Sequence, residues 1–176
     1  MMTIEQFAEK MATSLKQSNP DINVSIPRMR YALAGLINVG LVLALTGGLG
    51  AITGSAAGAL TAMAAFVLLR TFSGGYHVKS LELCVIVSTL LFVLIPMVPF
   101  PDKYTAFLTV LVALIVAIRS PVPHESNRIP AASYPFLKAI SIMVVCSNLF
   151  IGSAVIALAF AAQAILLIPS KGGEPT

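Results

Sequence analysis

Charged residues are scarce in this chain of 176 residues, of which only 10% are aspartate, glutamate, lysine or arginine. A soluble domain carries about 25%, so the composition excludes an ordinary soluble protein. Hydrophobic residues supply 57% of the chain. They are gathered in continuous runs, which are typical of membrane helices and not of the alternating strands of a β-barrel. We therefore predict an all-α integral membrane protein.

Cysteine and histidine are also rare. The two cysteines, Cys84 and Cys146, form neither a disulfide framework nor a CxxC pair. Two histidines without an HExxH motif are a poor zinc set, and no Walker or GxGxxG sequence is present. We expect no metal and no cofactor. The net charge of +4 is spread between the apolar runs, so nucleic acid is not an expected partner.

Six apolar runs predict a polytopic transmembrane bundle of about six helices, in a single integral-membrane domain over residues 1–176. A membrane span needs about 20 residues, and the last three runs are short. The predicted bundle covers residues 31–168 and has the lipid bilayer as its partner. The runs are Tyr31–Gly47, Leu49–Leu69, Leu81–Val98, Tyr104–Ile118, Phe136–Phe150 and Ser153–Ile168.

Residues 1–28 precede this bundle and predict a cytoplasmic amphipathic helix followed by a linker. Apolar residues recur there at helical spacing among charged ones, which is typical of a helix lying on the membrane surface. A helix that packs as a cap on the cytoplasmic face of the bundle is an equally good interpretation. The apolar residues are Ile4, Phe7, Ala8, Met11 and Leu15.

The distribution of basic residues predicts the orientation. With six spans, every lysine and arginine except Lys103 falls on one side of the membrane. Because basic residues stay in the cytoplasm, we expect both termini, the turn at residues 70–80 and the loop at residues 119–135 to face the cytoplasm. Any site in that turn or loop is then cytoplasmic.

The turn between the second and third runs brings together His77 and Cys84, an imidazole and a thiol that it can activate. Seven residues apart on one helix, they would be about 10 Å apart along the axis, too far for a hydrogen bond. We therefore expect a turn at Gly74 and Gly75 and a helix that starts with Ser80 as its N-cap. Cys84 then lies close to the start of that helix. A buried cysteine and an interfacial histidine without chemistry fit the spacing equally well.

Further polar residues flank this pair. Arg70 either snorkels to the membrane surface or binds a substrate carboxylate or an oxyanion, with help from the N–H groups at Gly74, Gly75 or the Ser80 helix start. The proline-rich second loop offers His124 as a rival base and, as binding candidates, Asn127 and Arg128. An ordinary basic cytoplasmic loop is the alternative interpretation of these three residues.

The second run also contains Gly50, Gly54 and Gly58 at four-residue spacing. Such a ridge of small residues lets two helices approach closely. It predicts packing within one chain or, alternatively, contact between two copies of the chain.

The sequence Gly74-Gly75-Tyr76-His77, with Arg70 before it and Cys84 after it, resembles the signature of the accessory gene regulator B (AgrB) family of membrane endopeptidases. The loop Ser120–Pro130 and the hydrophobic layout are similar to that family as well, over about residues 3–168. The resemblance implies a multi-pass enzyme of the bacterial plasma membrane that acts in peptide quorum sensing.

The resemblance also implies roles for individual residues. Cys84 and His77 match the family's catalytic pair, and Arg70 and Gly75 match its conserved arginine and glycine. The implied activity is a cysteine endopeptidase that removes the C-terminal tail of an AgrD-like propeptide and cyclises the acyl-enzyme to a thiolactone or lactone. Family resemblance further implies a homodimer. The alternative function is a non-enzymatic peptide exporter or accessory membrane subunit.

Overall fold

The structure of this protein is a computed structural model that describes residues 3–75, 80–122 and 131–168. The described residues are helical, apart from the connections and one isolated β-bridge. The seven α-helices are α1 (Ile4–Ser18), α2 (Ile26–Ile52), α3 (Ala56–Ser73), α4 (Leu81–Leu94), α5 (Thr105–Arg119), α6 (Tyr134–Ile151) and α7 (Ala154–Ile165). Short 3-10 turns lie at Ile95–Met97, Asp102–Tyr104 and Ala131–Ser133.

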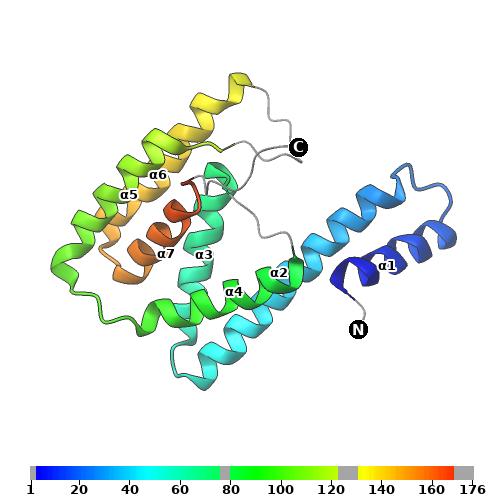
Figure 1. The fold of residues 1–176 in the computed structure, drawn as a ribbon, viewed down its shortest axis with the longest axis horizontal. Helices are drawn as coiled ribbons and strands as arrows, with labels where there is room; N and C mark the ends of the chain where they lie inside the picture. The colour runs from blue at the N-terminus through cyan, green and yellow to red at the C-terminus, as the bar shows by residue number, and fades with distance from the viewer. Residues whose placement is uncertain (1–2, 76–79, 123–130, 169–176) are drawn as a thin grey trace.

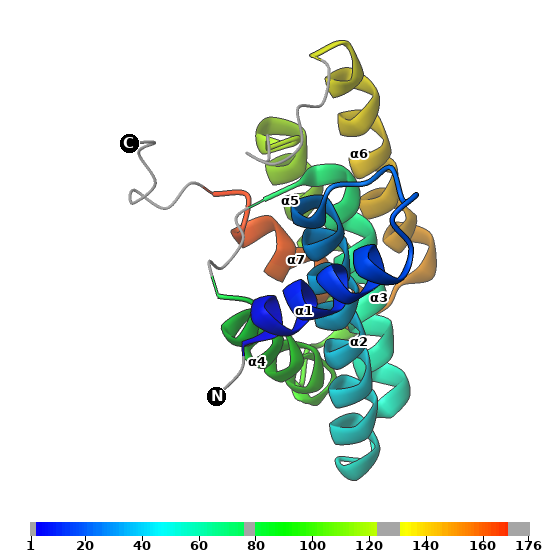
Figure 2. The same cartoon turned by 90° about the vertical axis from the view of Figure 1, so that its right-hand side faces the viewer.

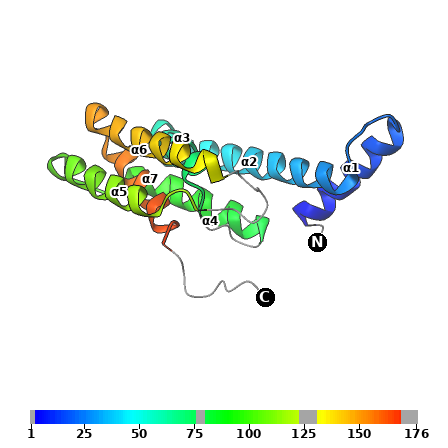
Figure 3. The same ribbon diagram turned by 90° about the horizontal axis from the view of Figure 1, so that it is seen from above.

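Helix α3 lies at the centre of the arrangement and packs against α2, α4, α6 and α7 (Figure 1). Seen from above, α2, α3 and α6 form one layer, and α4, α5 and α7 lie in a second layer against it (Figure 3). Helix α1 lies at one end of the molecule (Figure 1) and packs along α2, and it is nearest the viewer when the molecule is seen from that end (Figure 2). The C-terminal end of α3 therefore faces neighbours that come from several parts of the sequence.

The helices that are long and apolar enough to cross a membrane are fewer than the six predicted. Within the described ranges, α2, α3 and α6 qualify by length and composition. A fourth span is counted if α4 and α5 are taken together, although the pair is bent by 117° at its break, while α7 is shorter. The helical membrane class is thus confirmed, and the count of about six is not.

The first boundary between helices differs from the prediction. The predicted break between Gly47 and Leu49 is wrong, because α2 continues through both residues to Ile52. The chain turns instead at Gly54, which has a φ of +72°. Next to it, the Thr53 hydroxyl donates to the Gly50 carbonyl over 3.1 Å. A glycine lowers helix propensity without forbidding the helix, whereas this left-handed glycine between two hydroxyl residues ends it.

The predicted glycine ridge is therefore split between two helices. Gly50 lies in α2, and a Cβ added there would lie 2.9 Å from the Ala56 Cα at the start of α3. Gly58 lies in α3, and its added Cβ would lie 2.7 Å from the Cβ of Pro96. Both glycines thus allow close packing within the chain, as one of the two interpretations predicted.

Helix α1 forms where the amphipathic pattern predicted it, and it packs along α2. The Thr3 side chain and Gln6 form a capping box at its start. Ala8 and Ala12 are buried in the face of α1 that packs on α2. The larger apolar side chains on the other part of the stripe stay exposed. They are Phe7, Met11 and Leu15. The packing on α2 agrees with the interpretation of α1 as a helix that packs on the bundle, and its placement on the membrane surface stays a prediction.

The core lies where α3 meets α4, α6 and α7, and α5 joins it through its contacts with α6 and α7. Leu69 of α3 and Phe92 of α4 are almost completely buried there. The Phe66 and Phe92 rings pack edge to face, with centroids 5.2 Å apart, an arrangement that aromatic pairs favour. This packing holds the last turns of α3 in place, directly before the predicted site.

Candidate active site

Cys84 is the fourth residue of α4, where the sequence predicted it. Ser80 is the N-cap, with its side-chain oxygen accepting the Leu83 N–H over 3.3 Å. The Cys84 N–H donates to the Ser80 carbonyl over 3.0 Å. The Cys84 thiol is free, partly exposed, and 3.8 Å from the Ser88 hydroxyl.

Arg70 lies in the last turn of α3, a helix that packs against α4. The guanidinium is 5.8 Å from the centre of the Phe66 ring, within the range of a cation–π contact. It also donates to the Gln163 side-chain oxygen over 3.2 Å. Arg70 is thus held by its own helix and by α7, and does not simply extend into solvent.

Gly74 and Gly75 make the predicted turn, with φ values of +69° and +127°. The Gly74 N–H donates to the Arg70 carbonyl over 3.0 Å and so ends α3. This amide is already hydrogen-bonded, which leaves the Gly75 N–H as the better candidate oxyanion donor of the two. The Ser80 hydroxyl is similarly engaged, because it also donates to the Glu82 carboxylate over 2.8 Å.

The start of the second loop lies beside this turn. Val122 forms a parallel β-bridge with Gly74, and its N–H donates to the Ser73 carbonyl over 2.9 Å. The contact is so close that a Cβ on Gly74 would lie 2.3 Å from the Val122 carbonyl oxygen. The structure therefore joins the two loops that the sequence analysis selected independently.

Several predicted site residues lie outside the described residues. His77 belongs to residues 76–79, and His124, Asn127 and Arg128 belong to residues 123–130. Their roles remain predictions. Within the described part of the chain, no group of three histidine, cysteine, aspartate or glutamate side chains is placed to hold a metal.

Gln163, which was not among the predicted site residues, contacts the site from α7. This side chain is fully buried and reaches Arg70, Ser73 and Gly74. The signal was present, because Gln163 is the one strongly polar side chain among the alanine, valine, isoleucine, leucine and phenylalanine residues of α7. The sequence alone did not show which residues its amide would contact.

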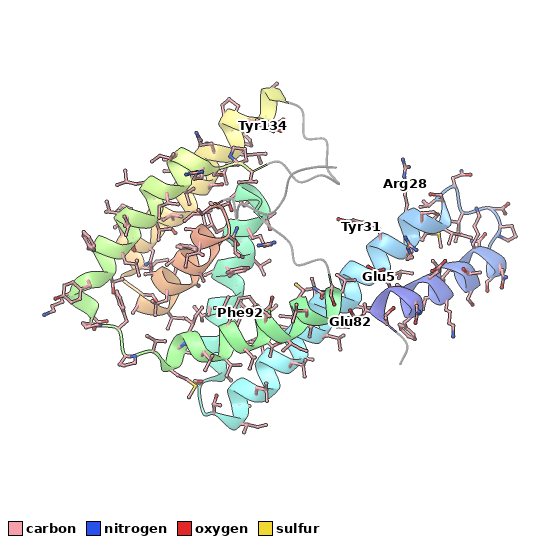
Figure 4. All side chains as sticks on the ribbon, viewed as in Figure 1. Glu5, Arg28, Tyr31, Glu82, Phe92 and Tyr134 are labelled. Carbon is pink, nitrogen blue, oxygen red and sulfur yellow. The ribbon has the colours of Figure 1, made fainter. Side chains whose placement is uncertain are left out.

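Glu82 connects the site to the N-terminal helix. One oxygen of its carboxylate accepts the Ile4 N–H at the start of α1 over 2.9 Å. The other oxygen accepts the Ser80 hydroxyl. Figure 4 shows Glu82 at the junction of α4 and α1, with Glu5 of α1 nearby. A single carboxylate thus stabilises the starts of two helices, in agreement with the preference of helix N-termini for negative charge.

These features define a helical membrane protein with a free thiol near the start of α4 and, at the end of the neighbouring α3, an arginine followed by a double-glycine turn. The chain matches the family model described as Accessory gene regulator B over residues 4–168, nearly its whole length, and it belongs to this family. No curated protein and no solved structure matches it. The family acts in quorum sensing and is known for propeptide processing, so membership implies an AgrD-like propeptide partner.

Proposed function

We propose that this protein is a membrane cysteine endopeptidase that removes the C-terminal tail of an AgrD-like propeptide and cyclises the remaining peptide. Cys84 is the nucleophile and His77 is the base. The observation that carries the proposal is the position of Cys84, a free and partly exposed thiol in the first turns of α4. Positive surroundings at a helix start are what a reactive thiol requires.

The reaction follows from these groups. His77 takes the thiol proton, and the Cys84 sulfur attacks a propeptide carbonyl carbon. Arg70 and the Gly75 N–H stabilise the negative oxygen of the tetrahedral intermediate. The intermediate collapses, His77 returns the proton to the departing amine of the tail, and a thioester remains on Cys84.

A second acyl transfer completes the reaction. A cysteine or serine side chain within the bound peptide attacks the thioester, its proton passes to His77, and the Cys84 thiolate leaves. The product is a thiolactone or lactone ring. The charge distribution of the sequence supports a site that faces the cytoplasm, where reducing conditions keep Cys84 free.

The test compares the activities of cysteine and histidine variants, with an AgrD-like propeptide as the substrate. Cys84→Ala, Cys84→Ser and His77→Ala are reconstituted in vesicles, and tail release is followed by mass spectrometry. We expect no tail release from Cys84→Ala and an acyl adduct on Cys84 in the unmodified protein. Cys146→Ala is the matched control and retains activity, because Cys146 lies in α6. Full tail release by Cys84→Ala would overturn the proposal. Absence of tail release from the unmodified protein would also overturn it, and this second outcome is the one that a non-enzymatic peptide exporter predicts.

A further inference from the structure

Gln163 is a buried amide in an otherwise apolar helix. Its side chain has no exposed surface, and it is the tenth residue of the twelve in α7. Burying an amide costs about 1–3 kcal/mol unless its polar atoms are hydrogen-bonded. A helix that only had to pack against α3 would be more stable with an apolar residue at this position. Packing alone therefore does not explain a glutamine at this position.

All the hydrogen bonds that Gln163 makes to described residues go to the end of α3. Its Oε1 accepts from Arg70 Nη1 over 3.2 Å. Its Nε2 donates to the Ser73 hydroxyl over 3.1 Å and to the Gly74 carbonyl over 2.7 Å. Chemistry determines this orientation of the amide, because arginine has only donors and a carbonyl has only an acceptor.

The bond to the Gly74 carbonyl has a consequence for the next residue. The Gly74 C=O and the Gly75 N–H belong to one planar peptide unit, and in the trans form they point in opposite directions. When Gln163 holds the carbonyl on its side, it also directs the Gly75 N–H away from α7. Gly75 has room for this arrangement only as glycine, since a Cβ there would lie 3.3 Å from Gln163 Nε2 at a φ of +127°.

We propose that Gln163 is a positioning residue for propeptide processing, which orients the Gly75 N–H and the Arg70 guanidinium together. The inference rests on the proposed function and adds to it a residue that does not itself touch the reacting atoms. One amide in α7 thereby connects the two candidate oxyanion donors. Donors that are oriented before the reaction need no reorganisation when the charge develops.

The test replaces Gln163 by methionine, which has a similar length and volume but cannot make these hydrogen bonds. Asn148→Leu is the matched control. Asn148 is also fully buried, and its amide bonds Thr109 over 3.1 Å and the backbone of Ser153 over 3.1 and 3.2 Å. Both variants lose a buried hydrogen-bonded amide, but only Gln163→Met loses one at the candidate site.

We expect the kcat of tail release to fall by about 10-fold to 100-fold in Gln163→Met, with KM nearly unchanged. Asn148→Leu retains its kcat per folded molecule, as measured after size-exclusion chromatography. An unchanged kcat in Gln163→Met, or an equal fall in both variants, would overturn the inference. If Gln163→Met does not accumulate, Gln163→Glu takes its place. It retains an acceptor for Arg70 but sets an oxygen against the Gly74 carbonyl, so the same fall in kcat is expected.

A double-mutant cycle tests whether Gln163 affects catalysis through Arg70. If Gln163 acts partly through Arg70, Gln163→Met costs less activity in an Arg70→Lys background than in the unmodified protein. If the activity losses of Gln163→Met and Arg70→Lys are fully additive, Gln163 does not act through Arg70. Cys84→Ala separates this inference from the proposed function. Activity in Cys84→Ala refutes the endopeptidase itself, whereas an inactive Cys84→Ala with an unaffected Gln163→Met refutes only the positioning role.

Discussion

Substitution of Gly74 by alanine should separate the two loops of the site. Gly74 has a φ of +69° and a ψ of −150°, close to a region that is essentially restricted to glycine, where another residue costs about 1–3 kcal/mol. The added Cβ would also lie 2.3 Å from the Val122 carbonyl oxygen. Because that oxygen belongs to the backbone, the clash cannot be relieved by a side-chain rotation.

The size of the effect follows from these contacts. Moving Val122 away breaks its hydrogen bond to Ser73, which contributes about 0.5–1.5 kcal/mol. The lost hydrogen bond and the backbone strain together disfavour the native turn by about 2–4 kcal/mol. At 1.4 kcal/mol for each factor of ten, the population of the native turn falls by roughly 30-fold to 1,000-fold. Propeptide processing per folded molecule should fall by a similar factor.

Gly152 provides a matched control. It also has a φ of +69°, in the left-handed region, but nothing lies within 4 Å of an added Cβ. Gly152→Ala therefore carries a backbone cost of about 1–2 kcal/mol without the clash, and it lies at the turn between α6 and α7. We expect Gly152→Ala to lower thermal stability while most of the processing rate remains. Equal rates in the two variants, measured in vesicles with the propeptide, would refute this reasoning.

Three further predictions concern the scaffold. Glu82→Ala removes the carboxylate at the start of α1, so amide hydrogen exchange in the first turn of α1 should become faster. In Lys10→Ala, an exposed position in the middle of α1, it should not, and equal exchange in the two variants would contradict the anchoring role of Glu82. Gly50→Ala should lower the melting temperature because the added Cβ would contact the start of α3. Gly40→Ala, with open space around the added Cβ, should preserve or raise the melting temperature, since alanine favours a helix by about 1 kcal/mol relative to glycine. The reverse order of melting temperatures would be inconsistent with this packing. Phe92→Ala, at 2% exposure, should lower the free energy of unfolding by about 3–5 kcal/mol in a denaturant titration, and a loss below about 1 kcal/mol would contradict its place in the core.

Local features of the site were predictable because their causes are local. Ser80 caps α4 through a hydrogen bond to a residue three positions later, so the sequence around it was sufficient to place the helix start and Cys84. The turn at Gly74 and Gly75 was predicted for the same reason, since only glycine readily adopts positive φ.

Helix boundaries between apolar runs were harder to predict. Gly47 and Gly48 looked like a break, yet both are helical, while Gly54 makes the turn. Composition does not distinguish these glycines. The hydroxyl of Thr53, which bonds back to Gly50, contributes to ending the helix at one of them. The pair α4 and α5 is likewise bent by 117° at its break, whereas each apolar run alone was predicted to be a span.

The sequence by itself determined the membrane class, the helical architecture, the family and the helix start that carries Cys84, because composition and short-range hydrogen bonding set all of these. Only the tertiary structure decided which distant residues meet at the end of α3. Gln163 contacts Arg70 across 93 positions of sequence, and Val122 pairs with Gly74. The partners in these contacts are selected by the packing of α7 and of the α5 end against α3. The sequence around Gln163 does not specify Arg70 as its partner, and the sequence around Val122 does not specify Gly74. Any neighbour that satisfied the same hydrogen bonds would serve equally well.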